Sequence, residues 1–134
     1  MKRRIILDTN FLLIPGQFNV DIFSEIARIC NFGYELVVVK ETVAELQGII
    51  ASKVSNGLAR ASAKLALQLM GRFKVKVVGD YRKVFKRADE AILAVADRNC
   101  LVATQDMQLK RALKGSGCGL IVLRQKQYLQ LFGG

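Results

Sequence analysis

Short aliphatic runs alternate with longer amphipathic segments along the chain. Five runs rich in aliphatic side chains predict buried strands over residues 5–7, 35–39, 73–78, 101–104 and 120–123. Apolar positions that recur every three or four residues predict helices over residues 20–30, 41–54, 58–71, from the mid-eighties to 99, and 106–114. Because strands and helices alternate, we expect a three-layer α/β/α sandwich whose central, mainly parallel sheet is covered on both faces.

Local signals refine the ends of these elements. Asn19 is positioned to cap the helix over residues 20–30. The glycine-rich segment 115–119 follows a predicted helix and precedes a predicted strand, so we interpret it as a helix end and a turn and not as a phosphate-binding loop. After the last predicted strand, residues 123–129 are expected to continue as a short helix with its basic side chains on the surface.

The composition favours one compact folded domain over residues 1–134. The chain is 51% hydrophobic and has one proline. No apolar run approaches the roughly 20 residues of a membrane span, so we expect a soluble, cytoplasmic protein outside the membrane. Cys30, Cys100 and Cys118 are isolated and predict buried free thiols. The absence of histidine excludes Ser-His-Asp and Cys-His mechanisms and histidine-ligated zinc.

A net charge of +10, from 21 basic and 11 acidic residues, favours a polyanionic partner. Nucleic acid is the first candidate for this partner, and an anionic membrane surface is the second. The alternative is that the basic residues only keep the protein soluble. The basic residues that we expect to contact RNA form two clusters, Arg82, Lys83, Lys86 and Arg87 in one, and Lys110 and Arg111 in the other. A solvated helix face explains each cluster alone, but both flank candidate catalytic acids.

Four acidic residues each lie early in the segment that follows a predicted strand. Asp8 comes directly after the first strand, and Asp106 comes two residues after the fourth. Asp89 shares an apolar helix face with Ile92, and Glu45 lies about one turn into its helix. The carboxyl ends of parallel strands line one crevice, so we expect the four carboxylates to converge there. For Asp8 alone, helix capping is an equally good explanation.

Convergence of four carboxylates requires a positive charge between them. Two unit charges ~4 Å apart repel by about 4 kcal/mol at an effective dielectric constant of 20. Oxygen ligands without histidine favour a hard cation, Mg²⁺ or Mn²⁺. A metal site in a strongly basic protein suggests that the basic surface holds a phosphodiester backbone while the metal activates water.

Four segments resemble the motifs of the PIN-domain ribonucleases, in the family's order and spacing and over essentially the whole chain. They are Leu-Asp-Thr-Asn-Phe-Leu-Leu-Ile-Pro at 7–15, Thr-Val-Ala-Glu-Leu at 42–46, Arg-Ala-Asp-Glu-Ala-Ile at 87–92, and Val-Ala-Thr-Gln-Asp-Met-Gln-Leu-Lys-Arg at 102–111. The resemblance implies a sheet of about five parallel strands and endonucleolytic cleavage of RNA that depends on Mg²⁺ or Mn²⁺.

The resemblance also assigns roles to residues. It implies that the metal site and the catalytic site share the same four acids, Asp8, Glu45, Asp89 and Asp106, and that Asn10 and Thr104 are their polar supports. Glu90 and Asp97 lie near the third motif, and either is a candidate to assist or replace Asp89.

Within the family, the first and fourth motifs are closest to the Fcf-like rRNA-processing branch and its archaeal single-domain relatives, with VapC toxins as the neighbouring branch. We therefore expect an endoribonuclease that acts in rRNA or other RNA processing on single-stranded RNA or an rRNA precursor. Two alternatives stay open, a catalytically weak RNA-binding or assembly module and a VapC-like toxin. A homodimer, a processing factor and an antitoxin are the candidate protein partners. Four aromatic side chains either stack on unpaired bases or pack against the core, namely Tyr81, Phe85, Tyr128 and Phe132.

Overall fold

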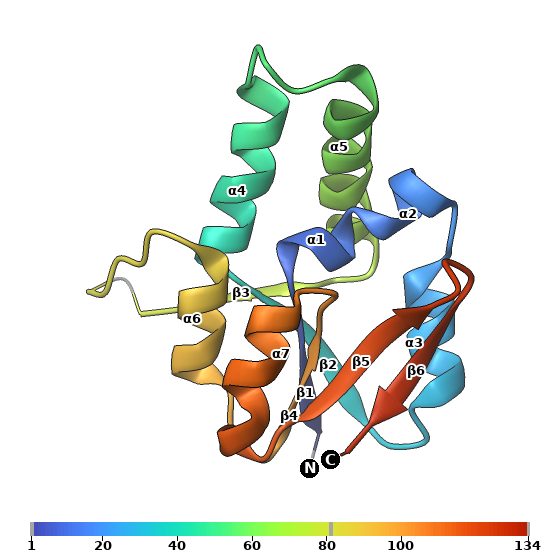
Figure 1. Ribbon diagram of the computed structural model, residues 1–134, viewed down its shortest axis with the longest axis vertical. Helices are drawn as coiled ribbons and strands as arrows, with labels where there is room; N and C mark the ends of the chain where they lie inside the picture. The colour runs from blue at the N-terminus through green and yellow to red at the C-terminus, as the bar shows by residue number, and fades with distance from the viewer. Residues whose placement is uncertain (1, 81, 134) are drawn as a thin grey trace.

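The computed structural model describes residues 2–80 and 82–133, and it shows a six-stranded sheet with helices on both faces (Figure 1). Tyr81, one of the candidate stacking residues, lies outside the described residues. The strand order is β3-β2-β1-β4-β5-β6. The strands have the bounds Arg3–Leu7 for β1, Tyr34–Val39 for β2, Lys76–Val78 for β3, Cys100–Ala103 for β4, Gly119–Arg124 for β5 and Tyr128–Phe132 for β6.

Strands β1 to β5 run parallel, and β6 runs antiparallel to β5. The predicted α/β/α sandwich with a mainly parallel sheet is confirmed, with six strands in place of about five. The helices have the bounds Thr9–Leu12 for α1, Ile14–Phe18 for α2, Ile22–Ile29 for α3, Lys40–Ala51 for α4, Gly57–Arg72 for α5, Ala88–Val95 for α6 and Met107–Leu113 for α7. A short 3-10 turn, η1, follows at Lys114–Ser116.

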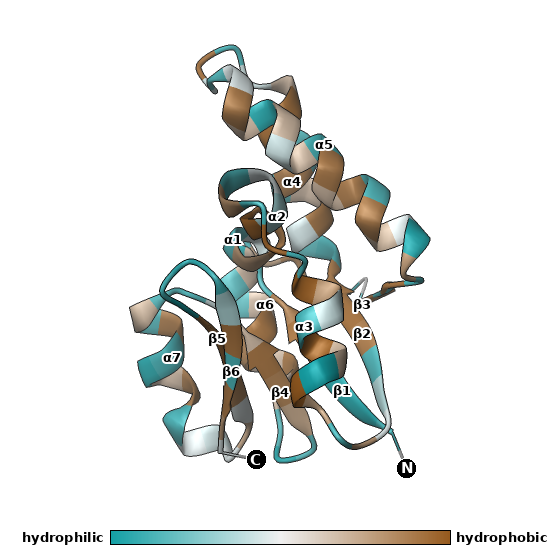
Figure 2. Ribbon diagram, turned by 90° about the vertical axis from the view of Figure 1, so that its right-hand side faces the viewer, coloured by the Kyte–Doolittle hydropathy of each residue, from teal (hydrophilic) through white to brown (hydrophobic). Residues whose placement is uncertain are grey.

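Strands β1, β2, β4 and β5 contribute side chains to two hydrophobic clusters, one on either face of the sheet. On β1, Ile5 and Leu7 pack into the cluster that also contains residues of α1, α3 and α5. Ile6 points the other way and packs with Ile92 of α6 and Leu109 of α7. This packing on both faces explains why β4 is apolar throughout and why β1 and β2 are apolar in their second halves. In Figure 2, β4 is brown, whereas part of β1 is teal.

The prediction of a helix over residues 123–129 is wrong, because the chain turns back there and forms β6. Gln125 and Lys126 have positive φ angles of 53° and 55°, which reverse the chain between β5 and β6. Leu129 then becomes buried in the same cluster as Leu123 on β5. The alternation of polar and apolar residues over Tyr128–Phe132 is a strand pattern, and it was the signal for this element.

Three other boundaries differ from the prediction. Helix α3 is capped by Asp21, whose carboxylate accepts a hydrogen bond from Ser24 N at 3.1 Å, whereas Asn19 ends α2 in the left-handed conformation. Strand β3 begins only at Lys76, because Phe73 still caps α5 and Lys74 has a φ of 56°. Helix α6 ends at Val95, several residues before the predicted end.

The three cysteines are free, with Cys30 and Cys100 buried as predicted and Cys118 only half-buried. Among the described residues, none of the helices has both the length and the apolar character needed to span a bilayer.

Both chain termini lie at one end of the sheet (Figure 1). Helices α1, α4 and α7 begin at the opposite end, where the neighbouring strands β1, β2 and β4 finish, so the loops after these strands meet there.

Candidate active site

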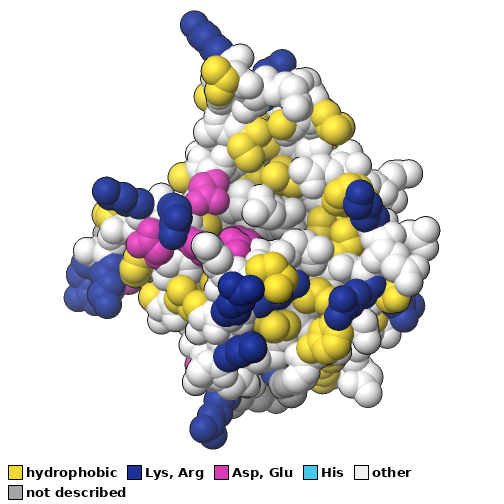
Figure 3. All heavy atoms as spheres, viewed as in Figure 1, with side chains coloured by type: hydrophobic (Ala, Val, Ile, Leu, Met, Phe, Trp, Pro, Cys, Tyr) yellow, Lys and Arg dark blue, Asp and Glu magenta, His cyan; other side chains and the backbone are white. Residues whose placement is uncertain are grey.

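Four carboxylates from four separate segments line one hollow at the carboxyl ends of the central strands. The hollow has a volume of about 190 Å³ and is lined by Asp8, Thr9, Asn10, Glu45, Arg87, Asp89 and Asp106. The acidic side chains form a single patch on this face, with basic side chains on either side of it (Figure 3). The structure therefore brings together all four acids that the sequence indicated, together with Asn10.

Asp8 is held in place by the strand before it and the helix after it. Its backbone N–H extends the β1–β4 ladder by donating to Ala103 O at 3.0 Å. Asp8 Oδ1 accepts a hydrogen bond from Thr9 N at 2.8 Å and caps α1, and Oδ2 accepts one from Thr104 Oγ1 at 2.8 Å. Capping and a place in the hollow are therefore compatible for the same side chain.

Thr104 couples Asp8 to Asp106. Its hydroxyl is fully buried, donates to Asp8 Oδ2 and accepts a hydrogen bond from Asp106 N at 3.0 Å. Asp106 caps α7, with Oδ1 accepting hydrogen bonds from Gln108 N at 2.8 Å and Leu109 N at 3.2 Å. Because both bonds use Oδ1, they fix the orientation of the Asp106 carboxylate without using Oδ2.

Glu45 connects three helices at the wall of the hollow. Its Oε1 accepts a hydrogen bond from Thr9 Oγ1 on α1 at 2.7 Å. Its Oε2 accepts one from Ala88 N, the first residue of α6, at 2.8 Å. Since a helix N-terminus carries unpaired N–H groups and partial positive charge, this contact both positions α6 and stabilises the Glu45 carboxylate.

Asp89 and Arg87 form an ion pair inside the hollow. Arg87 Nε lies 3.2 Å from Asp89 Oδ1 and 3.5 Å from Glu90 Oε1. Arg87 is the one cation among the seven residues that line the hollow. The sequence placed Arg87 on the RNA-binding surface, but its contact with the acids depends on how α6 begins.

The remaining candidates lie outside the hollow. Glu90 is exposed and contacts Arg87, and Asp97 accepts a hydrogen bond from Asn99 N at 2.9 Å in the turn before β4. Arg82 forms an ion pair with Asp80 at 3.3 Å. The other basic candidates, Lys83, Lys86 and Arg111, are exposed, and Lys110 is half-buried on α7.

Sequence reasoning missed Thr9, which lines the hollow and donates to Glu45, and it also missed Glu41, a buried acid on the same helix as Glu45. Thr9 follows Asp8 directly, and its hydroxyl oxygen also lies 3.4 Å from Thr42 Oγ1. Glu41 is buried one helical turn before Glu45, and its Oε2 accepts a hydrogen bond from Phe85 N at 3.4 Å. The i, i+4 spacing of the two glutamates on α4 was the available signal.

Burial raises the pKa of the Asp8 carboxyl above its ordinary value. The hydrogen bonds from Thr104 and Thr9 lower this pKa, whereas the nearby charges of Glu45 and Asp106 raise it further. Ionised Asp8 is therefore less favourable in the folded chain than in the unfolded chain. A cation in the hollow would remove much of this penalty, because it would offset both the burial and the repulsion.

This electrostatic penalty predicts that, in EDTA, Asp8→Asn gains stability relative to the wild type as the pH rises from 4 to 7. A raised folded-state pKa means that the penalty is present above that pKa, is relieved as the pH falls through it, and is absent below the unfolded value of about 3.9. The advantage of the variant should therefore shrink as the pH is lowered. Urea unfolding of both proteins between pH 7 and pH 4 measures this difference, and an advantage that did not change with pH would contradict the prediction.

The four acidic side chains of the hollow would offer only carboxylate oxygens to a metal. Oxygen ligands of this kind are the ones that a hard divalent cation prefers. Within residues 2–80 and 82–133, no three acidic or thiol side chains converge closely enough to form a metal centre as they stand. Asp89 is turned toward Arg87 instead. Cation binding would require Asp89 to exchange its arginine partner for the metal.

Comparisons with known proteins agree with this fold. A family model described as a PIN like domain matches residues 5–126. Ribonuclease VapC4 of Methanocaldococcus jannaschii is 33% identical over 132 residues, which cover 97% of each chain. The PIN domain endonuclease Utp24 has a similar fold, with a TM-score of 0.76 and 19% identity over 96% of this chain and 90% of that one. A domain of a functionally unknown protein from M. jannaschii matches with a TM-score of 0.60 and 17% identity, covering 91% of each chain.

Proposed function

The chain belongs to the PIN-like domain family, and we propose that it is an endoribonuclease that cleaves single-stranded RNA with the help of Mg²⁺ or Mn²⁺. The observation that carries the proposal is the convergence of four carboxylates from distant segments around one hollow in a protein with a net charge of +10. The proposed metal ligands and catalytic residues are Asp8, Glu45, Asp89 and Asp106.

Each residue has a role that follows from its contacts. Asp8 and Asp106 are held by hydrogen bonds to backbone and to Thr104, so their carboxylates are preorganised. A divalent cation, as PIN-domain ribonucleases generally use, would supply positive charge at the scissile phosphate and lower the pKa of water. Arg87 lines the same hollow, and its guanidinium would be able to hold a phosphate oxygen if its ion pair with Asp89 were broken.

The relative VapC4 favours a toxin role for this activity. Its 33% identity extends over nearly the full length of both chains, whereas the likeness to Utp24 is a likeness of fold at 19% identity. We therefore favour a VapC-like ribonuclease with an antitoxin partner over a function in rRNA processing. Induced expression in a bacterial host should arrest growth, and Asp8→Asn should abolish the arrest. Growth unaffected by the wild-type protein at equal expression would count against the toxin role.

The cleavage reaction itself tests the proposed function. We expect the wild-type protein to cut a fluorescent, unstructured RNA in Mg²⁺ or Mn²⁺ and to be inactive in EDTA. Asp89→Asn should lower the rate by about 10²-fold, a typical loss when one transition-state contact is removed. Asp97→Asn is the matched control, because it removes the same charge outside the hollow and retains the turn hydrogen bond. RNA binding without cleavage in either metal would instead support the binding-module alternative.

A further inference from the structure

A second hollow, of about 250 Å³, lies between α7 and the β5–β6 hairpin. Lys110, Lys114, Leu120 and Phe132 are among the residues that line it, and none of its lining residues belongs to the acidic hollow. Lys110 lies four residues after Asp106, which corresponds to about 6 Å along the axis of α7. We call this hollow the α7 groove. It is linked to the acidic hollow through α7, because Asp106 caps this helix and Lys110 lies on it.

Cations along the α7 groove have no acidic partner. Neither Lys110, Lys114 nor Arg124 forms an ion pair with a described carboxylate. Partial burial and the nearby charge of Arg124 lower the pKa of the Lys110 ammonium, whereas Asp106 raises it. Lys110 and Arg124 are thus close enough to repel each other, and an anion bound between them would relieve that repulsion.

The groove also offers an aromatic surface. Phe132 lies on the edge strand β6 and is 38% exposed. The Arg124 guanidinium lies 5.0 Å from the centre of its ring, and Arg124 Nε donates to Gln130 Oε1 at 3.2 Å. Hydrophobic and basic side chains gather over α7 and this hairpin, next to the acidic patch (Figure 3). Cations beside an exposed ring are the pattern by which proteins bind unpaired nucleotides.

The other basic cluster is less available for a polyanion. Two of its four cations, Arg82 and Arg87, already form ion pairs with acids of the same segment. A substrate strand that passes through the acidic hollow has to leave along a neighbouring surface. Of the two directions, the one along α7 offers cations without acidic partners together with an exposed ring.

We propose that the α7 groove binds an unpaired nucleotide next to the cleaved bond of a single-stranded RNA. The base stacks on Phe132, and a phosphate lies between Lys110 and Arg124. Lys114 faces the following nucleotide. Stacking and phosphate contacts tolerate any base, so this subsite increases affinity without reading sequence. The proposal rests on the proposed function, because it takes RNA as the substrate.

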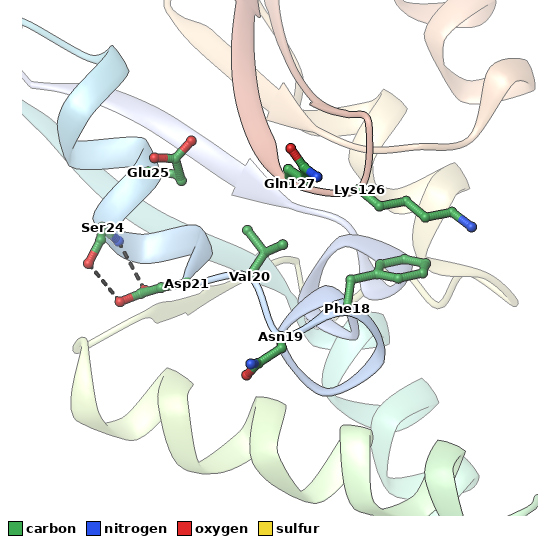
Figure 4. A pocket seen from close by; sticks show the side chains of 8 residues that line it. All are labelled: Phe18, Asn19, Val20, Asp21, Ser24, Glu25, Lys126 and Gln127. Atoms are coloured by element: carbon green, nitrogen blue, oxygen red, sulfur yellow. Dashed lines mark hydrogen bonds between the residues drawn. The ribbon is translucent and has the colours of Figure 1, made fainter.

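A hollow between α2, α3 and the tip of the same hairpin supplies the matched aromatic control. Phe18 lines it and is 39% exposed, with Lys126 Nζ 5.4 Å from the centre of its ring (Figure 4). Phe18 therefore matches Phe132 in exposure and in having a cation above the ring, but it lies outside the α7 groove. Lys64, exposed on α5, is the matched control for charge.

The test measures binding in EDTA, where no cleavage occurs, on the full chain carrying Asp8→Asn. Fluorescence anisotropy with a labelled 12-nucleotide unstructured RNA gives the affinity. Phe132→Leu should weaken binding by about tenfold, the usual effect of losing one stacked base, and Phe132→Tyr should retain it. Phe18→Leu should change the affinity less than twofold. Circular dichroism and thermal unfolding confirm that each variant is folded.

The salt dependence of binding tests the phosphate contact separately. Because Lys110 and Arg124 share one phosphate, Lys110→Gln and Arg124→Gln should each reduce the slope of log K against log salt, and the double variant should reduce it by about 0.7, the value for one phosphate of a single strand. Lys64→Gln should leave the slope unchanged. Wild-type affinity in all three groove variants would overturn the inference even if cleavage is metal-dependent. If the groove variants weaken RNA binding but the wild type never cleaves RNA, the result would support the nucleotide subsite and count against the proposed function. The inference would also be overturned if the three groove variants weakened binding of a poly-glutamate peptide but did not weaken binding of RNA. The groove would then be a protein-docking site.

Discussion

Replacing Asp8 or Asp106 with asparagine is expected to reduce metal-dependent RNA cleavage by about 10²–10³-fold. Asparagine retains the size of each side chain and its capping hydrogen bond through Oδ1. At position 8, the amide NH₂ takes the place of Oδ2 and no longer accepts the hydrogen bond from Thr104 Oγ1. What is lost is one negative charge and one oxygen ligand in a site that needs both. Initial rates on a labelled single-stranded RNA in Mg²⁺ and in Mn²⁺ measure the effect.

Two further measurements decide whether this loss comes from catalysis. In EDTA both variants should bind RNA at least as tightly as the wild type, because removal of a carboxylate lowers repulsion of the phosphate backbone. The Asp8→Asn/Asp106→Asn double variant should be about as slow as either single variant, since residues that act as a unit are not additive. Asp21→Asn is the matched control, because Asp21 caps α3 as Asp106 caps α7. Equal losses in Asp21→Asn and Asp106→Asn would show that capping, and not the site, was disturbed.

Thr104→Val is expected to lower the cleavage rate by about 10–100-fold although Thr104 contacts neither metal nor substrate in our proposal. Valine has nearly the same shape but removes the hydroxyl that joins Asp8 Oδ2 to Asp106 N. Both buried groups would lose a partner, so the free energy of unfolding should fall by about 1–3 kcal/mol. Thr104 is therefore a positioning residue, and the Mg²⁺ concentration at half-maximal rate should rise.

Thr104→Ser separates positioning from packing. Serine keeps the hydroxyl and loses a methyl group, so it should lower stability by about 1 kcal/mol while retaining most of the cleavage rate. Urea unfolding and magnesium titrations of both variants give the comparison. A valine variant that required no more Mg²⁺ than the wild type would show that the hydroxyl does not position the acids.

The sequence predicted which acidic side chains lie together better than it predicted where helices and strands begin and end. Asp8 and Asp106 were expected to lie close together because each follows a buried run, and such runs were clear from Ile5–Leu7 and Leu101–Ala103 alone. The last strand was missed because a five-residue segment with one buried and one half-buried leucine suits either a short helix or a strand until its partner is known.

Hydrophobic periodicity by itself determined the alternation of strands and helices, and this alternation requires a parallel sheet with its strand ends at one edge. Composition by itself determined the absence of histidine chemistry and the strong positive charge. The tertiary structure alone decided that Arg87 lies among the acids, that Thr104 joins Asp8 to Asp106, and that Arg124 lies over Phe132. The physical reason is that periodicity specifies which face of an element is buried, whereas contacts between side chains depend on how separate elements are oriented in space.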